Sequence, residues 1–326
     1  MGWIAAVLND SSGTGDGATH ARRLEEIFAT GGREARVIGA RTGAQLRDEM
    51  ERAVQEGCEV LVAGGGDGTI NTAASALAGR DIPLGVIPLG TLNHFAKDLG
   101  IPLELEEAAK VVLDGTMCRV DVGEVNGHLF LNNSSLGVYP AIVRLRERYQ
   151  AGGFGKWIAA LWAGLTVLRR HPFMAVRITA EGETRIRQTP FVLVGNNQYR
   201  MTGLNASTRE SLVGGQLAVY VVNAERRTGL LRLAWQVIRK GPEEVEELDL
   251  LTVESTIIET RRRRLQVALD GEVVPLESPL EYRIKPAHLR VYVPAASSAC
   301  HPLPAPPSSN GLPNSPPASS PRSPPL

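Results

Sequence analysis

Apolar residues along the first 120 positions form short runs that alternate with longer segments of helical periodicity. The runs of four to six residues predict strands, and the segments between them place apolar side chains such as Leu24, Ile27 and Phe28 on one helix face. Strands that alternate with helices predict a parallel sheet covered on both faces. The predicted strands are 3–8, 35–38, 59–63 and 84–87, and the predicted helices are 18–29, 44–55 and 69–78.

From about residue 119 the pattern changes to short alternating strands separated by turn signals such as Asn126–Gly127. This predicts a second, mainly antiparallel β domain, with helical inserts at 141–149, 156–169 and 229–240. We therefore expect an α/β domain over 1–122 and a β domain over 123–293. The predicted strands of the β domain are 119–124, 128–132, 175–180, 184–188, 191–195, 216–222, 255–260, 265–269, 282–284 and 289–293.

The last 33 residues, 294–326, hold 11 of the 21 prolines and show no apolar periodicity. Such a segment cannot bury enough apolar surface to offset the entropy lost on ordering it. We expect a disordered tail, either inert or extended for a partner.

Charge and cysteine content limit the class of protein. The 35 basic and 35 acidic residues cancel, which argues against nucleic acid as a partner and restricts any membrane contact to a local patch. The three cysteines lack zinc-site spacing, and Cys58 and Cys118 are expected to be buried free thiols of a reducing compartment. The first residues predict a strand rather than a signal peptide. We expect a cytoplasmic protein with, at most, transient membrane association.

A glycine-rich loop follows the third predicted strand and reads GGGDGT at 64–69. Glycines let backbone N–H groups approach phosphate oxygens, and the start of a helix attracts the same anion. Asp67 adds a carboxylate for Mg²⁺ or for a proton. The loop is not of the Walker type, because no Gly-Lys-Ser/Thr follows. A tight turn alone would need fewer glycines, so the sequence predicts a phosphate site.

Two other loops follow predicted strands and should lie at the same edge of the sheet. PLGTLN at 88–93 offers Gly90, Thr91 and Asn93 to a nucleotide, or serves only as a helix cap. The loop after the first strand contains Asn9 and Ser12, and is either a further nucleotide contact or a plain surface loop.

An Asp-Gly pair at 270–271 in the β domain predicts a hairpin turn. Such a turn can also project Glu272 into the cleft between the domains. A lipid or sugar hydroxyl is a poor nucleophile until a positioned carboxylate accepts its proton. We therefore consider Glu272 a candidate general base. The alternative is a hairpin turn without a catalytic role.

Five motifs in order along the two domains resemble the diacylglycerol kinase catalytic family, in its soluble bacterial branch, related to sphingosine and ceramide kinases. The resemblance implies a Rossmann-like, phosphofructokinase-like α/β domain, a β-sandwich-like second domain, and ATP with Mg²⁺ between them. It also implies transfer of the γ-phosphoryl group to a hydroxyl of diacylglycerol or a similar membrane lipid. The motifs are GGGDGTIN at 64–71, PLGTLNHFAKDLGIP at 88–102, NNSSLGVYP at 132–140, VGNNQY at 194–199 and LDGE at 269–272.

The same resemblance implies roles for individual residues. Glu272 is the implied proton acceptor with Asp270 beside it, and Asp67 lies near metal and phosphates or shares the role of base. Asn9 and Ser12 belong to the implied first loop, in which Asp10 replaces a proline. The residues implied to bind the nucleotide are Asn9, Ser12, Gly64, Gly65, Gly66, Asp67, Gly68, Thr69, Ile70, Asn71, Gly90, Thr91 and Asn93.

One departure from the family pattern concerns an accessory Mg²⁺ site. Many relatives carry an acid just before the strand predicted at 216–222, where this chain has Gly214. Only the carbonyls of Ser211 and Gln216 are left as expected contributors, so the accessory site is in doubt. The Mg²⁺ that arrives with ATP is unaffected.

Two segments could contact an anionic membrane surface. Residues 156–170 combine two tryptophans, apolar bulk and a basic end, which is typical of an interfacial helix or of a helix packed on the β domain. Residues 261–264 are four arginines, which would meet anionic headgroups or form a solvated face.

Two other functions are compatible with the pattern. An NAD-kinase-like small-molecule kinase shares a GGDGT-type loop but lacks the PLGTLN and LDGE context. A catalytically silent nucleotide- or lipid-binding regulator is compatible with Gly214, whereas Asp67 and Glu272 argue against it. The sequence leaves the oligomeric state open, a homodimer included.

Overall fold

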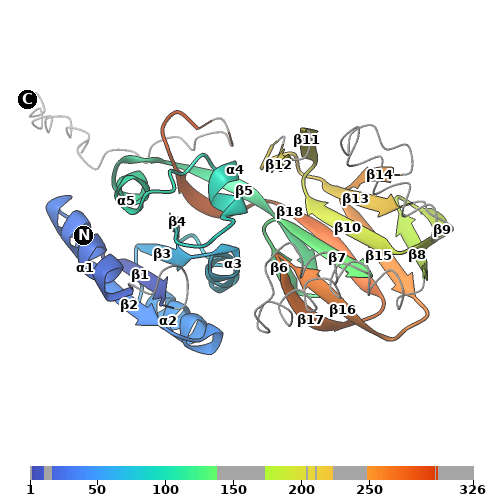
Figure 1. Cartoon of the computed structure of the whole chain (residues 1–326), viewed down its shortest axis with the longest axis horizontal. Helices are drawn as coiled ribbons and strands as arrows, with labels where there is room; N and C mark the ends of the chain where they lie inside the picture. Colours follow the sequence, from blue (N-terminus) through green and yellow to red (C-terminus); the bar gives the residue numbers. More distant parts are fainter. Residues whose placement is uncertain are drawn as a thin grey trace, which may run out of the picture.

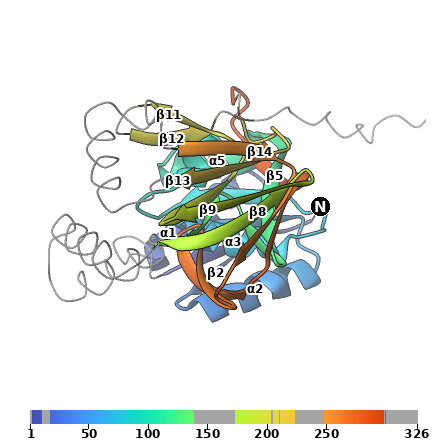
Figure 2. The same cartoon turned by 90° about the vertical axis from the view of Figure 1, so that its right-hand side faces the viewer.

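The computed structural model describes residues 2–10, 17–137, 173–202, 205–209, 211–222, 248–297 and 299. They form an α/β domain and a β domain that lie side by side (Figure 1). Viewed along the long axis, the β domain lies in front of the α/β domain (Figure 2). The helices are α1 (Gly17–Thr30), α2 (Gly43–Gln55), α3 (Asp67–Ala76), α4 (His94–Asp98) and α5 (Leu105–Asp114). The strands are β1 (Ile4–Asn9), β2 (Ala35–Ala40), β3 (Val60–Gly65), β4 (Leu84–Pro88), β5 (Thr116–Val125), β6 (His128–Phe130), β7 (Asn133–Gly137), β8 (Met174–Ala180), β9 (Glu183–Thr189), β10 (Phe191–Asn196), β11 (Tyr199–Thr202), β12 (Asn205–Arg209), β13 (Leu217–Val222), β14 (Leu248–Val253), β15 (Ser255–Thr260), β16 (Arg264–Leu269), β17 (Glu272–Glu277) and β18 (Leu280–Val293).

The α/β domain contains the parallel sheet that the alternating pattern predicts. Strands β2, β1, β3 and β4 pair in parallel in that order. Strands β1 and β3 are buried almost throughout, as expected of strands covered on both faces. Helix α1 contributes Leu24 and Phe28 to the core, and α2 contributes Met50. The carboxyl ends of β1, β3 and β4 therefore bring the three predicted loops to one edge.

The last strand joins the two domains into one sheet. β18 is 14 residues long and pairs antiparallel with β5 along most of its length, while Val291 pairs with Leu84 of β4. Its other end pairs with β15 of the β domain. The division at residue 122 stays a prediction, because β5 continues from Thr116 to Val125 across it.

The β domain is the mainly antiparallel sandwich expected from the sequence. A six-stranded sheet, β14-β13-β10-β7-β16-β17, packs against the sheet that contains β5, β18, β15, β8 and β9. The core between them includes Phe130 and Tyr282, whose rings meet edge to face at 6.3 Å. Edge-to-face contact is a preferred geometry of aromatic pairs.

Several strands differ from the predicted ones. The predicted strands 282–284 and 289–293 are both parts of β18, which continues through an irregularity between Lys285 and Leu289. β7, β11, β12, β14 and β17 were not predicted. β7 is a buried central strand made of Asn, Ser, Ser, Leu and Gly, and such a composition hides its strand character from a hydropathy pattern. β17 contains Pro275, which is compatible with its position at the edge of the sheet.

The two cysteines expected to be free thiols differ. Cys58 is buried and free, and burial raises the pKa of its thiol to about 11. Cys118 is buried but disulfide-bonded, so the expectation of a free thiol was wrong there.

Some predicted features lie outside the described residues. They are Ser12, the helical inserts at 141–149, 156–169 and 229–240, and residues 300–326 of the predicted tail. Ser297, near the start of that tail, donates a hydrogen bond from Oγ to the carbonyl of Leu99 at 2.8 Å. Among the helices of the described part, none is long and apolar enough to span a membrane.

Candidate active site

Two glycine loops meet at the carboxyl end of the parallel sheet. β3 ends at Gly65 and α3 begins at Asp67, with Gly66 as an N-cap that makes no side-chain capping bond. A Cβ added to Gly90, after β4, would collide with the Cα of Gly66. The loops can approach this closely because Gly90 has no side chain, whereas a Cβ at Gly66 would make only an ordinary contact of 3.5 Å with the Cα of Gly90. The first N–H groups of α3 have no intrahelical acceptor, so they provide donors for an anion.

Asn93 holds the second loop in place. It adopts a left-handed conformation with φ of 50° and is buried. Its Nδ2 donates to the carbonyl of Gly90 at 2.8 Å, and its Oδ1 accepts from the Gly90 N–H at 3.0 Å. The amide is thus engaged within the loop, which sets Gly90 against Gly66. The neighbouring Thr91 is exposed.

The remaining predicted nucleotide residues lie around α3. Asn9, at the end of β1, donates from Nδ2 to Oγ1 of Thr69 at 3.3 Å, so the first and third strands meet at the loop. Ile70 is fully buried in the core, where its role is packing. Asn71 donates to the carbonyl of Leu129 at 3.3 Å and thereby links α3 to the β domain, while its buried Oδ1 has no hydrogen-bond partner among the described residues.

Asp67 joins the two loops through its carboxylate. Oδ2 accepts from the N–H of His94 at 3.3 Å, and Oδ1 accepts from the N–H of Phe95 at 3.1 Å. These are the first amides of α4, so Asp67 caps that helix from another element. A carboxylate has about four lone-pair positions, so capacity for a metal remains.

Glu272 reaches this loop from the β domain. A Cβ added to Gly68 would lie 2.5 Å from Oε1 of Glu272, so the carboxylate packs over the start of α3. Glu272 is exposed and follows the turn at Asp270 and Gly271, both of which have positive φ. The structure therefore brings together the predicted phosphate loop and the predicted base, which are far apart in sequence.

Asp270 anchors the turn that carries Glu272. Its Oδ2 accepts from the N–H of Leu131 at 2.7 Å, and its Oδ1 accepts from the N–H groups of Asn132 at 2.7 Å and Asn133 at 3.0 Å. Burial raises the pKa of the Asp270 carboxyl to about 6, whereas these three donors and Arg209 lower it. Its contacts are those of a structural anchor, and its catalytic role stays a prediction.

The two residues expected at the accessory metal site, Ser211 and Gln216, accept hydrogen bonds from nearby backbone N–H groups. The carbonyl of Gln216 accepts from the N–H of Asn197 at 3.0 Å, and Ser211 Oγ accepts from the N–H of Val213 at 3.0 Å. A Cβ at Gly214 would lie 2.7 Å from Oδ1 of Asn197. The described residues contain no group of three or more His, Cys, Asp or Glu that could hold a metal ion. The accessory metal site at the carbonyls of Ser211 and Gln216 stays a prediction.

Sequence reasoning missed a buried ion pair beside the site. Arg209 of β12 donates from Nε to Oδ2 of Asp98 at 2.7 Å, and the two side chains are 0% and 4% exposed. Asp98 lies inside the PLGTLNHFAKDLGIP motif, so an acidic residue at this place in the motif was a signal that the sequence offered. Nothing local marked Arg209, because its strand is short and polar.

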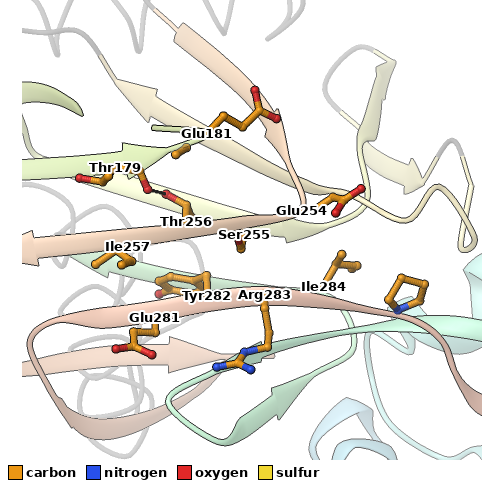
Figure 3. A pocket seen from close by; sticks show the side chains of 12 residues that line it. Thr179, Glu181, Glu254, Ser255, Thr256, Ile257, Glu281, Tyr282, Arg283 and Ile284 are labelled. Carbon is orange, nitrogen blue, oxygen red and sulfur yellow. Dashed lines mark hydrogen bonds between the residues drawn. The ribbon is translucent and has the colours of Figure 1, made fainter. Parts of the chain in front are cut away.

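A separate cavity of about 590 Å³ lies between β8, β15 and β18 (Figure 3). It contains none of the predicted site residues. Glu181, Glu254 and Glu281 line it with Arg283, and Thr256 donates to the carbonyl of Thr179 at 3.1 Å at its wall. Three carboxylates around one cation make an unsuitable site for a polyanionic nucleotide. The glycine loops remain the nucleotide candidate.

The geometry agrees with comparisons to known proteins. Residues 4–125 match the model of the diacylglycerol kinase catalytic domain, and residues 153–293 match the YegS C-terminal NAD kinase beta sandwich-like domain. The chain is 33% identical over 284 residues to the "Probable lipid kinase YegS-like" of Pseudomonas aeruginosa, covering 82% of this chain and 87% of that protein. It is 28% identical over 305 residues to a diacylglycerol kinase of Mycobacterium tuberculosis, covering 90% and 96%.

A solved structure shows the same fold. The crystal structure of a diacylglycerol kinase from Bacillus anthracis superposes with a TM-score of 0.67 at 21% identity, covering 90% of this chain and 98% of that chain. The order of domains, the glycine loops and the relatives agree with one another. The chain therefore belongs to the diacylglycerol kinase family of lipid kinases, with a catalytic α/β domain followed by a YegS-type β-sandwich domain.

Proposed function

We propose that this protein transfers the γ-phosphoryl group of ATP to a hydroxyl of diacylglycerol or a similar membrane lipid. The observation that carries the proposal is the contact of the Glu272 carboxylate with Gly68. The Glu272 carboxylate of the β domain lies over the first turn of α3 in the other domain, which supports a base beside an anion bound at that helix start. A phosphoryl transfer between a bound nucleotide and a second substrate needs this pair of features.

The loop residues fit ATP. The close approach of Gly66 and Gly90 leaves backbone rather than side chains at the start of α3, and the helix has no side-chain cap. Amides of Gly66 to Thr69 can therefore donate to phosphate oxygens. Asp67 retains lone pairs after binding the amides of α4, which suits Mg²⁺ held by one carboxylate and substrate phosphates.

The chemistry needs little covalent help from the protein. MgATP supplies the phosphoryl group and the positive charge that its oxygens require. Glu272 orients the lipid hydroxyl and accepts its proton as the new O–P bond forms and the bond to ADP breaks. The proton then passes from Glu272 to solvent. Asp270 holds the turn that aims Glu272, so positioning and charge stabilisation are the main contributions.

Contact with a membrane is part of the proposal. Leu92, between Thr91 and Asn93, is 52% exposed and provides an apolar side chain beside the site. The side chains of Arg263 and Arg264 are 84% exposed and lie 3.5 and 3.6 Å from the Glu277 carboxylate. Flotation with anionic and neutral vesicles tests this contact. Equal recovery with both would count against an anionic surface.

The kinase assay uses ATP labelled at the γ-phosphate, Mg²⁺ and mixed micelles. The lipid panel contains diacylglycerol, monoacylglycerol, phosphatidylglycerol, a sphingoid base and a polyprenol, with NAD as a soluble acceptor. Loss of a general base should lower turnover of Glu272→Gln by about 10²–10⁴-fold. Glu277→Gln, at the other end of β17, is the matched control and should remain active.

The outcomes separate the candidate functions. A labelled lipid that disappears in Glu272→Gln supports the kinase and its base. A labelled NAD would favour the NAD-kinase-like alternative. ATP binding without any labelled acceptor would favour a silent regulator. Normal turnover by Glu272→Gln would remove Glu272 from the mechanism.

A further inference from the structure

We propose that Arg209, through its buried pair with Asp98, is a positioning residue that sets Glu272 against the phosphate loop. The inference rests on the proposed function, because it takes Glu272 as the base. Arg209 and Asp98 do not touch the loop glycines in any described contact. They act through the two carboxylates of the site.

The Arg209 guanidinium lies between the domains, and each of its three nitrogens donates to a fixed partner. Nε binds Asp98 at 2.7 Å, Nη2 binds Oδ1 of Asn132 at 3.1 Å, and Nη1 binds the carbonyl of Leu131. The ring of Phe95 lies 5.7 Å from the guanidinium carbon. A guanidinium spreads its donors over three nitrogens in one plane, whereas an ammonium has all its donors on one nitrogen and cannot reach the same three separated positions.

From Arg209 the contacts lead to Glu272 through residues 131–133. This segment connects β6 to β7, and Arg209 holds its oxygen side while Asp270 accepts all three of its N–H groups. Tyr199 adds a bond to the carbonyl of Asn132 at 2.8 Å. Asp270 and Gly271 then lead directly into Glu272. A shift of this segment would therefore move the base.

From Asp98 the contacts lead to the other carboxylate. Asp98 is the last residue of α4, and the first amides of that helix bind Asp67. Helix α4 has five residues, which span only about 7 Å. Arg209 thus connects Asp67 and Glu272 by one short helix on one side and one short segment on the other.

The burial of the pair points to positioning rather than stability. Removing two charges from water is costly, and apolar residues of similar size often stabilise a fold as well or better. Apolar side chains could fill the same volume. The buried guanidinium, whose three nitrogens all have partners, instead fixes one relative arrangement of α4, residues 131–133 and the turn before Glu272.

The first test is kinetic and uses Arg209→Lys, which keeps the charge but loses the fork. A base displaced by about 1 Å should lower kcat by about tenfold to a hundredfold while KM for ATP changes less than about twofold. Adding Arg209→Lys to Glu272→Gln should cause a loss smaller than the product of the two separate losses, because the position of an absent base has no effect. The inference would be overturned if the losses of Arg209→Lys and Glu272→Gln multiply in the double variant, or if kcat of Arg209→Lys alone is unchanged.

Two further variants test whether unfolding, rather than a displaced base, causes the loss of kcat. The double variant Asp98→Asn with Arg209→Gln leaves no unpaired buried charge and should show the same kcat loss. Arg23→Lys, at the exposed pair of Arg23 with Glu106 at 3.1 Å, is the control and should keep wild-type kcat. A kcat loss that disappears when rates are divided by the folded fraction would contradict positioning.

A second readout does not depend on turnover. Hydrogen–deuterium exchange of the full chain should show faster exchange at 130–134 and 270–273 in Arg209→Lys, with exchange at β1 unchanged. If the wild type labels no acceptor, the proposed function fails, and exchange still decides the structural part. Equal exchange at 270–273 in both proteins would overturn the role of Arg209.

Discussion

Oε1 of Glu272 occupies the space above Gly68, where a Cβ would lie 2.5 Å from it. The relationship joins the β domain to the first turn of α3. The candidate base can take this position only because Gly68 has no side chain. The consequences can be measured separately for activity, nucleotide binding and stability.

Gly68→Ala should reduce lipid phosphorylation without loss of stability. The new methyl group displaces the end of a flexible side chain, and alanine in a helix is favoured over glycine by about 0.5–1 kcal/mol. Displacement of the carboxylate should lower kcat by about tenfold or more. Gly43→Ala, in α2 with open space around its Cβ, is the control. Unchanged kcat in Gly68→Ala would separate Glu272 from the reaction.

Gly90→Ala and Gly66→Ala should differ although the glycines touch. A Cβ at Gly90 meets the backbone of Gly66, which cannot move aside, so unfolding by urea should show a loss of about 1–3 kcal/mol. A Cβ at Gly66 lies 3.5 Å from the Cα of Gly90, an ordinary contact, so stability should change little. Both variants should weaken MgATP binding in calorimetry. Wild-type affinity in Gly66→Ala would exclude the loop as the phosphate site.

Asn93→Asp should destabilise the second nucleotide loop. The carboxylate still accepts from the Gly90 N–H but cannot donate to its carbonyl, and a buried acceptor left without its donor costs about 1–3 kcal/mol. KM for ATP should rise. Asn126→Asp is the control, because Asn126 is also left-handed and its Nδ2 binds carbonyls of Glu277 and Pro279, at the end of β17 remote from Glu272. A KM that rises equally in both variants would contradict a local role for Asn93.

Asp270 should leave a pH signature in stability. Burial raises the pKa of its carboxyl from 3.8 to about 6, so between these values the folded protein holds a proton that the unfolded chain has released. The contribution of this group to the free energy of unfolding therefore falls as pH rises from 3.8 to about 6. The difference in that free energy between wild type and Asp270→Asn should fall over the same window and be flat above it.

Urea unfolding of both proteins at several pH values across that window measures this difference. A constant difference would contradict a raised pKa. A difference that grows with pH would mean that the amides of residues 131–133 and Arg209 outweigh burial and lower the pKa instead.

The sequence alone determined the features that depend on neighbouring residues. The glycine loop between β3 and α3 follows from glycines placed between an apolar run and a helix, because backbone access and helix starts are local properties. The parallel sheet follows from alternating strands and helices, and the turn before Glu272 follows from its Asp-Gly pair. The same motifs, in order, indicated the family.

Only the tertiary structure decided what those residues contact. Arg209 meets Asp98 across 111 positions, and Asp270 meets Leu131 across 139, so no window of periodicity contains either pair. It also showed that the amide of Asn93 serves its own loop and that β18 returns to the first domain. The physical reason is that strand register and interdomain packing are set by many distant contacts at once, whereas hydropathy and turn chemistry report only on residues adjacent in the chain.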